Sequence, residues 1–216
     1  MRSMKAINFD IQSVRGIFNN KKTQMRIVMK PQPIPVGSGL SFKNGYIASG
    51  DYQRHELVFR YSKLKIGEII YVKEPWAEAT PTTKVFIDTG AYVYKETLWE
   101  QNMPWNWRSS ASMPLYAARL FLRIQYISVE RLNAISESDI FAEGIIKPAG
   151  YAKEQFIHLQ DVFARMWDKS HYGRLGCQWG DNPLVWVYGI KSHELTPDEM
   201  QQTKKDKYNY LLSRRR

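Results

Sequence analysis

The sequence is poor in the residues that build disulfides and metal sites. Its 216 residues include one cysteine, Cys177, and four histidines scattered along the chain. One cysteine excludes an intramolecular disulfide and is typical of a protein from a reducing compartment. The histidines form neither an HExxH pair nor another close ligand spacing, so we expect no metal site and no cofactor.

Long apolar runs and glycine motifs for nucleotides are also missing. No stretch approaches the ~20 apolar residues of a membrane span, and the N-terminus lacks the apolar segment of a signal peptide. We therefore expect a cytoplasmic protein without a membrane partner. Neither GxGxxG nor GxxxxGKS/T occurs, which argues against a doubly wound nucleotide-binding fold.

The positive charge is concentrated at the two ends of the chain. The formal net charge is +10, of which residues 1–30 carry +6 and residues 204–216 carry +5, while the 173 residues between them sum to −1. Such an excess attracts polyanions, and nucleic acid is the most common one inside cells. The alternative is that these charges only keep the protein in solution. RNA, or a nucleoside or nucleotide, is the partner that the charge favours.

The hydrophobic pattern predicts an α+β chain. The segments MKAINFD, TQMRIVMK, IGEIIYVKEPW, LFLRIQYISV and NPLVWVYGI have the alternation or apolar character of strands. Helical spacing occurs in IQSVRGIFNN, in SESDIFAEGI and in KEQFIHLQDVFARMWDKSHYG. Ser136 and Asp139 are spaced as the two residues of a capping box. In the last helix the predicted apolar stripe is Phe156, Leu159, Val162, Phe163 and Met166. Several strands with few, short helices favour a small mixed β-barrel with short helices packed around it.

Two segments depart from this regular pattern. Residues 31–66 are rich in Pro, Gly and Ser and are interpreted as an insertion with a hairpin around Asn44-Gly45. KVFIDTGAYVYK predicts a second hairpin that turns at Asp88-Thr89-Gly90. The tail from residue 196 onward is expected to be helical or without regular structure.

The segment NNKKTQMR, residues 19–26, is the first candidate site. A lysine can act as a base, or activate a hydroxyl, only when burial or nearby positive charge lowers its pKa. Lys21, Lys22 and Arg26 supply such charge, and Thr23 supplies a hydroxyl. Carboxylates that could pair with them are Glu74, at a strand end, and Glu143, at the end of a short helix. The alternative is a surface strand with solvated charges, and spacing alone leaves the choice open.

A second candidate site combines tryptophans with basic residues. MPWNWRSS places two tryptophans beside Arg108, a combination that can stack a nucleobase and hold a phosphate. Together with the basic segment, this predicts a ligand-binding cleft lined by Lys21, Lys22, Arg26, Lys73, Glu74, Trp76, Trp107 and Arg108. Tryptophans in loops are as often core residues that cover one end of a barrel.

Five segments together resemble the ASCH family, a PUA-like β-barrel group related to RNA-binding domains. KKTQMR resembles GRKTxTxR, GEIIYVKEPW resembles GDxLWVRETW, and NWRSSASMP resembles a KWRPSxxMP segment of phage members. VERLNAISESDIFAEGI is similar to VERLQDITEEDAxAEGI, and NPLVWVYGI to NPWVWVIEF. The matches run in family order from residue 4 to 192. The resemblance implies one domain, residues 1–195, with the insertion at 31–66 and a basic tail at 196–216.

The resemblance also implies candidate catalytic residues. Some small ASCH proteins are amidohydrolases that remove the acetyl group of acetylated cytidine, using a lysine and a threonine of the basic loop and a glutamate of the AEG-like segment. By position the lysine is Lys22 and the glutamate is Glu143, whereas the threonine position holds Met25. A thioether cannot attack an acyl carbon. Thr23 then becomes the candidate hydroxyl, at the cost of a two-residue shift along the strand.

Three hypotheses follow for the function. The first is an RNA- or nucleotide-binding ASCH protein of phage or prophage origin. The second is an amidohydrolase on an acylated, acetylcytidine-like nucleoside, with Lys22 as the base, Glu143 as its partner and either Thr23 or a water molecule as the nucleophile. The third is a non-catalytic module in phage development that binds a protein partner through residues 31–66 or 196–216.

Overall fold

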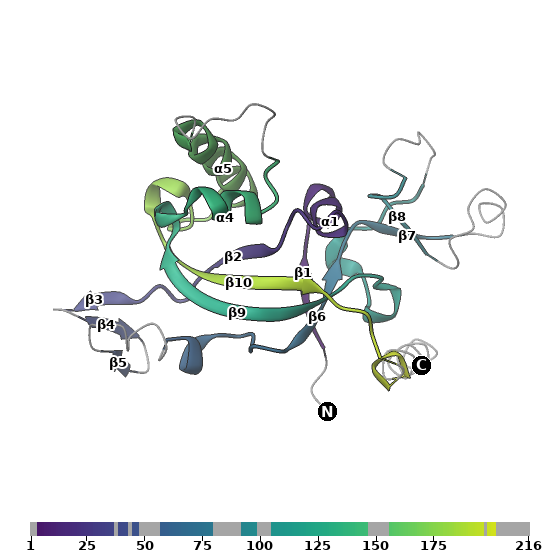
Figure 1. Cartoon of the computed structure of the whole chain (residues 1–216), viewed down its shortest axis with the longest axis horizontal. Helices are drawn as coiled ribbons and strands as arrows, with labels where there is room; N and C mark the ends of the chain where they lie inside the picture. Colours follow the sequence, from purple (N-terminus) through teal and green to yellow (C-terminus); the bar gives the residue numbers. More distant parts are fainter. Residues whose placement is uncertain are drawn as a thin grey trace. The chain divides into compact units, whose positions relative to one another are not determined.

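The computed structural model describes residues 4–36, 39–42, 45–47, 57–79, 92–98, 105–146, 156–196 and 198–201 (Figure 1). The chain divides into two compact units. Unit 1 comprises residues 1–19, 69–123 and 191–216, and unit 2 comprises residues 20–68 and 124–190. The one-domain organisation expected from the family resemblance stays a prediction.

Unit 1 begins with a strand and a short helix. β1 (Lys5–Asn8) is followed by α1 (Ile11–Phe18), whose N-terminus is capped by the Asp10 side chain. β1 pairs in parallel with β6 (Ile69–Lys73), and β6 pairs antiparallel with the first residues of β9 (Phe121–Arg131). A separate antiparallel pair joins β7 (Trp76–Glu78) to β8 (Tyr92–Tyr94). The short 3₁₀ turns Ser110–Ser112 and Leu115–Ala117 precede β9.

Unit 2 holds β2 (Gln24–Val28), most of β9, and β10 (Leu184–Ser192) up to residue 190. β2 pairs antiparallel with β10, so that Arg26 lies opposite Val187 and Met25 opposite Tyr188. Two helices, α4 (Glu137–Ala142) and α5 (Phe156–Ser170), lie on one face of these strands (Figure 1). Further 3₁₀ turns occur at Leu132–Ala134 and Trp179–Asp181.

The strand order confirms the α+β class. Hydrogen bonding follows the order β1-β6-β9-β10-β2, in which β1 and β6 are parallel while β6 with β9 and β10 with β2 are antiparallel. The sheet is therefore mixed, as expected. Among the described strands this order is open, so closure into a barrel stays a prediction.

The core of unit 2 shows how the sequence positions α4. β2 and β10 contribute Val28, Val185 and Val187, and the segment after β9 contributes Leu132, Ile135 and Ile140. From α5 the buried residues are Leu159, Phe163 and Trp167. The predicted stripe was wrong at Met166, which is 47% exposed, because Leu159, Phe163 and Trp167 follow each other at i, i+4 and i+8 and rotate the buried face by one residue.

The insertion forms regular structure in its described part. β3 (Ile34–Val36), β4 (Gly39–Phe42) and β5 (Gly45–Ile47) make a three-stranded antiparallel sheet. β4 and β5 pair with Phe42 opposite Gly45, which confirms a hairpin at this place, although Asn44 itself lies outside the described residues. The predicted turn at Asp88-Thr89-Gly90 also lies outside them. Residues 57–61 are helical.

Candidate functional site

Alternation along the chain sends every second side chain of the basic segment toward α4. In an extended chain successive side chains point to opposite sides, so Lys22, Gln24, Arg26 and Val28 share one side. Val28 belongs to the core formed with α4 and α5, which identifies this side as the one that faces the helices. Lys22 forms an antiparallel β-bridge with Glu143, the residue that ends α4.

Lys22 and Glu143 form a buried ion pair, which selects Glu143 over Glu74 as the carboxylate beside the basic segment. The Lys22 Nζ atom donates to the Glu143 carboxylate at 2.9 Å and to the Glu143 backbone carbonyl at 2.8 Å. Their side chains are only 7% and 8% exposed. These two hydrogen bonds to one residue hold the Lys22 ammonium group in place, because they use two of its three protons.

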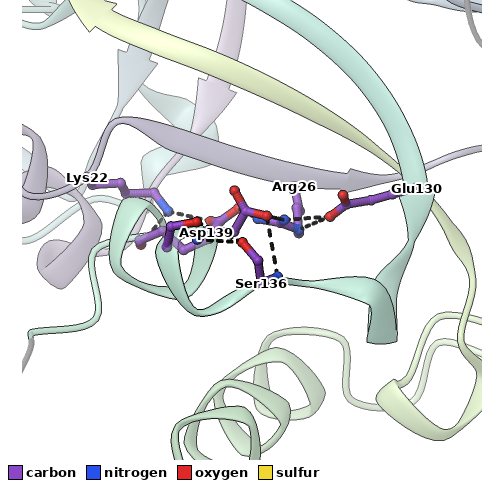
Figure 2. Close-up of polar contacts among 7 residues, drawn as sticks. Lys22, Arg26, Glu130, Ser136 and Asp139 are labelled. Carbon is purple, nitrogen blue, oxygen red and sulfur yellow. Dashed lines mark hydrogen bonds and ion pairs between the residues drawn. The ribbon is translucent and has the colours of Figure 1, made fainter. Parts of the chain in front are cut away.

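Arg26 lies in the same cluster and binds three carboxylates (Figure 2). Its Nε and Nη2 atoms donate to Glu130 of β9, Nη1 donates to Glu143 at 2.9 Å, and Nη2 lies 3.2 Å from Asp139. The Arg26 side chain is fully buried. Burial by itself lowers the pKa of Arg26, but the negative charges of Glu143 and Glu130 outweigh this effect and raise it. The guanidinium is therefore charged.

Helix α4 positions two of these carboxylates. Asp139 and Glu143 are four residues apart, so they lie on the same side of the helix. Ser136 caps the helix, and both hydrogen bonds of the expected capping box with Asp139 are present, which confirms that prediction. Burial raises the pKa of Asp139, but the hydrogen bonds from Ser136 and the charge of Arg26 have the larger combined effect and lower it. Asp139 is thus an anion that takes part in the N-terminal cap of α4 and also lies beside Arg26.

Gln24 completes the cluster from β2. With its amide oriented to satisfy both neighbours, the amide nitrogen donates to Asp139 Oδ1 at 3.0 Å and the amide oxygen accepts from Arg26 Nη1 at 3.2 Å. We call Lys22, Arg26, Glu130, Asp139 and Glu143 the charge cluster. With two cations and three anions it carries a formal charge of −1, so the basic segment does not present all of its positive charge to solvent.

Neither the Thr23 side chain nor the Met25 side chain lies on the side of the strand that carries Lys22. Met25 pairs opposite Tyr188 and is 3% exposed, on the face of the strand away from Arg26. Thr23 follows Lys22 directly and so points to the opposite side. Its backbone N–H donates to Ala142 and its carbonyl accepts from Ile190. The structure therefore brings Lys22 and Glu143 together, while the Thr23 hydroxyl points away from them.

Thr23 and Lys21, two residues apart, instead line an open pocket. The pocket has a volume of about 460 Å³ and is formed by Asn20, Lys21, Thr23, Phe141, Ala142, Ile145 and Ile146. Lys22 and Glu143 are not among its lining residues. The bridge between Lys22 and Glu143 thus separates two environments, with buried charges on one side and an accessible hollow on the other.

Tyr126 of β9 lies beside the charge cluster and was not predicted. Its ring occupies the space above Gly189, where an added Cβ would come within 2.1 Å of Tyr126 Cε1. Burial raises the pKa of Tyr126, and the negative charge of Asp139 raises it further. Gly189 is therefore the residue that allows this ring to pack on the strand.

In unit 1, Glu74 is a structural ion pair partner. Its carboxylate is 1% exposed and accepts two hydrogen bonds of 2.9 Å, from Nε and Nη2 of Arg119. Arg119 also donates to Thr97 and Glu96, and its guanidinium lies over the ring of Tyr94. Burial raises the pKa of Glu74, and Arg119 only partly offsets this effect. Contact of Glu74 with a ligand stays a prediction.

The tryptophan segment combines buried and accessible groups. Trp76 is 2% exposed and packs with Met113 and Ala117, and the Arg108 guanidinium lies 5.0 Å from the centre of its ring. Arg108 is exposed and pairs with Glu78 at 3.0 Å. Trp107 is half-buried. Lys73 donates to the carbonyl of Ala111 at 2.9 Å. We call Lys73, Trp107 and Arg108 the aromatic–basic surface.

The predicted ligand-binding residues therefore fall into two sets, one in each unit. Unit 2 holds the residues Lys21, Lys22, Thr23, Arg26 and Glu143, and unit 1 holds the residues Lys73, Glu74, Trp76, Trp107 and Arg108. A single cleft lined by both sets stays a prediction.

Sequence reasoning missed three residues that hold these sites together. Glu130 and Arg119 gave no local signal, because their partners are 104 and 45 residues away in the chain. Asp139 was assigned only to the helix cap. The spacing of Asp139 and Glu143 would have placed both carboxylates on one side of α4 and so pointed to a shared cation.

Within the described residues, no group of His, Cys, Asp and Glu side chains is placed to hold a metal ion. In the same part of the chain, no helix is both long and apolar enough to cross a membrane.

No family model and no curated protein matches the sequence.

Two of the solved structures that are similar to this chain come from bacteria. Protein EF3133 from Enterococcus faecalis V583 is 10% identical, with 93% of this chain and 83% of that chain covered and a TM-score of 0.44. The ASCH domain from Lactobacillus crispatus JV V101 is 13% identical, with coverage of 88% and 79% and a TM-score of 0.36. Likeness at this level leaves the family of the chain open.

Proposed function

We propose that this protein binds RNA, or a nucleotide-like polyanion, through the aromatic–basic surface of unit 1. The observation that carries the proposal is an exposed Arg108, whose guanidinium lies over the Trp76 ring, and, on the other side of the β7–β8 pair, a half-buried Trp107 that packs against Ala77 and Val93. A ring that keeps part of its surface open can stack a base, and a neighbouring guanidinium can hold the adjoining phosphate. The five ASCH-like segments and the basic chain ends support the same function, and with it a PUA-like barrel and a phage or prophage origin.

The contacts of the two cations leave donors for phosphate. Lys73 uses one ammonium proton for the carbonyl of Ala111, so two remain. Arg108 binds Glu78 through Nη1 alone, and both side chains of this pair are about half exposed, at 42% and 51%. An exposed pair of this kind stabilises the protein by less than about 1 kcal/mol, so a phosphate can replace Glu78 at little cost.

The test is a filter-binding titration of single-stranded RNA at increasing salt. The unmodified protein should bind with an affinity that falls as salt rises, because each phosphate contact releases counterions. Arg108→Gln should flatten the slope of log K against log salt by about 0.7, the value of one single-strand contact. Trp107→Leu should weaken binding by about 1–3 kcal/mol with the slope unchanged, since it removes an aromatic ring but no charge, while leucine keeps an apolar contact with the Ala77 and Val93 cluster.

Two variants serve as controls for these results. Arg165→Gln removes an exposed charge from α5 in unit 2 and should leave the affinity and the slope nearly unchanged. Glu78→Gln frees Arg108 and should strengthen binding at low salt. Absence of binding at low salt, or binding that does not depend on salt, would show that the protein has another function.

The buried Lys22–Glu143 pair favours a second candidate function, hydrolysis of an acylated nucleoside. These two residues occupy the positions of the lysine and glutamate in the ASCH amidohydrolases, and they are in contact. Because Met25 and the Thr23 hydroxyl point to the other side, we propose a water molecule as the nucleophile. Lys22 would hold the acyl oxygen. Glu143 would take a proton from the attacking water as the new C–O bond forms and pass it to the amino nitrogen of the cytidine as the C–N bond breaks, which releases acetate and cytidine.

Chromatography of acetylated cytidine after incubation with the protein tests this candidate. Deacetylation should be lost in Lys22→Ala and in Glu143→Gln, and should persist in Thr23→Val. Turnover that survives the loss of Lys22 would exclude the assigned roles. Loss of turnover in Thr23→Val, with the fold intact by circular dichroism, would return the hydroxyl to the reaction.

A further inference from the structure

The pocket beside α4 combines unpaired polar groups with an apolar wall. Its polar side consists of Asn20, Lys21 and Thr23, all exposed, and within the described residues neither the Lys21 ammonium nor the Thr23 hydroxyl has a hydrogen-bond partner. The apolar side consists of Phe141 and Ala142 at the end of α4 with Ile145 and Ile146 after it. Ile146 is 76% exposed. Such a hollow offers one cation, one hydroxyl and an uncovered aliphatic surface.

The backbone holds these groups in fixed positions. Asn20 adopts a left-handed conformation, with φ of 54°, immediately before the basic segment. The Thr23 N–H donates to Ala142 at 2.8 Å, and the Lys22–Glu143 bridge follows on the same two segments. Glycine at position 144 has φ of 96°, and an added Cβ there would lie 3.1 Å from Lys22 Cβ. The two walls of the pocket are thus joined by hydrogen bonds and close packing.

The volume sets the size of a ligand. About 460 Å³ lies within the range of about 300–1,000 Å³ that is usual for small-molecule sites. Charge complementarity to Lys21 favours an anionic group, and Thr23 can donate to the same group. The apolar wall favours a compact aliphatic or aromatic body. The charge cluster cannot compete for the anion, because it lies across the Lys22–Glu143 bridge and its two cations are already paired.

We propose that this pocket is a binding site for a small amphipathic anion, held by Lys21 and Thr23 at its anionic end and by Ile145 and Ile146 at its apolar end. The ligand class is an aromatic or aliphatic body that bears one phosphate or carboxylate. The site lies within unit 2 and does not depend on RNA binding by the aromatic–basic surface of unit 1. It also gives Thr23 a role as hydrogen-bond donor in place of nucleophile.

Calorimetric titrations of the full chain with three compounds test the proposal. AMP provides a phosphate with an aromatic body, decanoate provides a carboxylate with an aliphatic body, and adenosine lacks the anion. Either anionic compound should bind and adenosine should bind at least about five-fold more weakly, since the charge-assisted contact at Lys21 is then missing. Binding of AMP alone identifies a phosphate ligand, and binding of decanoate alone identifies a carboxylate ligand.

Matched variants connect this binding to the pocket. Lys21→Gln should weaken it about five- to ten-fold and Thr23→Val about three-fold, because a partly exposed charged contact is stronger than a neutral hydrogen bond. Lys30→Gln removes an exposed lysine of the same unit outside the pocket and should change nothing. Trp107→Leu should also leave the affinity unchanged, which separates this site from the RNA surface. The proposal is overturned if neither anion binds, or if binding is equal in Lys21→Gln and the unmodified protein.

Discussion

Replacement of Arg26 by leucine tests whether the charge cluster is the main support of α4. Arg26 is fully buried and binds Glu130, Asp139 and Glu143. Arg26→Leu keeps the position apolar and removes the guanidinium. The cluster then changes from a formal charge of −1 to −2, with Lys22 as its only cation.

The expected loss follows from the exposure of the carboxylates that remain. Removing one partner of a buried ion pair costs about 3–5 kcal/mol. Glu143 is 8% exposed but keeps Lys22, whereas Glu130 and Asp139 are 22% and 29% exposed and can be hydrated in part. The loss should therefore lie near the lower end, about 3 kcal/mol. At a urea m-value of about 2–3 kcal/mol/M this lowers the unfolding midpoint by about 1–1.5 M.

Urea unfolding, followed by circular dichroism at several pH values, measures this loss. Arg165→Leu, at an exposed position of α5, is the control and should change stability by less than about 0.5 kcal/mol. The folded pKa of Asp139 is lowered, so its ionisation stabilises the protein above the ordinary aspartate pKa of about 3.9 and ceases to do so as pH falls through the lower folded value. The difference between the unmodified protein and Arg26→Leu should shrink over the same acid range. A loss below about 1 kcal/mol at neutral pH would refute the assigned role of the cluster.

Three further substitutions test the packing around the candidate sites. Gly189→Ala should destabilise the protein by about 1–3 kcal/mol, because the new Cβ meets the Tyr126 ring. In thermal melts, part of the lost stability should return when Tyr126→Ala is added. A Gly189→Ala variant as stable as the unmodified protein would contradict the contact. Ser136→Ala should cost about 0.5–2 kcal/mol through loss of the α4 cap, and Ser136→Asp should restore most of it in the same melts. Arg119→Leu should cost about 3–5 kcal/mol because it strands the buried Glu74 carboxylate, and the double variant with Glu74→Leu should be more stable than Arg119→Leu alone in urea unfolding.

Local features of the fold could be predicted because their causes lie within a few residues. The cap of α4 depends on Ser136 and Asp139, which are three residues apart, and both of its hydrogen bonds are present. The strands β1, β2, β6, β9 and β10 follow from alternation or apolar runs in their own segments. For the buried face of α5, the prediction is confirmed at Leu159 and Phe163 and wrong at Met166, while the burial of Phe156 lies outside what the structure describes. Periodicity constrains a helix face only to within about one residue, and the packing partner decides the rest.

The candidate site was predictable only in part, for a related reason. The family resemblance identified Lys22 and Glu143, which lie 121 residues apart and form a hydrogen-bonded ion pair. It did not reveal Glu130 or Asp139 as partners of Arg26. A resemblance carries over the residues of its motifs, whereas the partners that balance a buried charge are set by the elements packed around it.

The sequence by itself indicated the α+β class, the N-cap of α4 at Ser136 and the basic segment, and the family resemblance singled out Lys22 and Glu143. The tertiary structure decided which way each residue of NNKKTQMR points. Alternation along the strand sends Lys22 and Arg26 into the charge cluster, buries Met25 against the other face, and leaves Lys21 and Thr23 in the open pocket. The physical reason is that the residue type alone sets the chemistry of a side chain, whereas its burial and its charge partners depend on which distant segments of the chain pack against it.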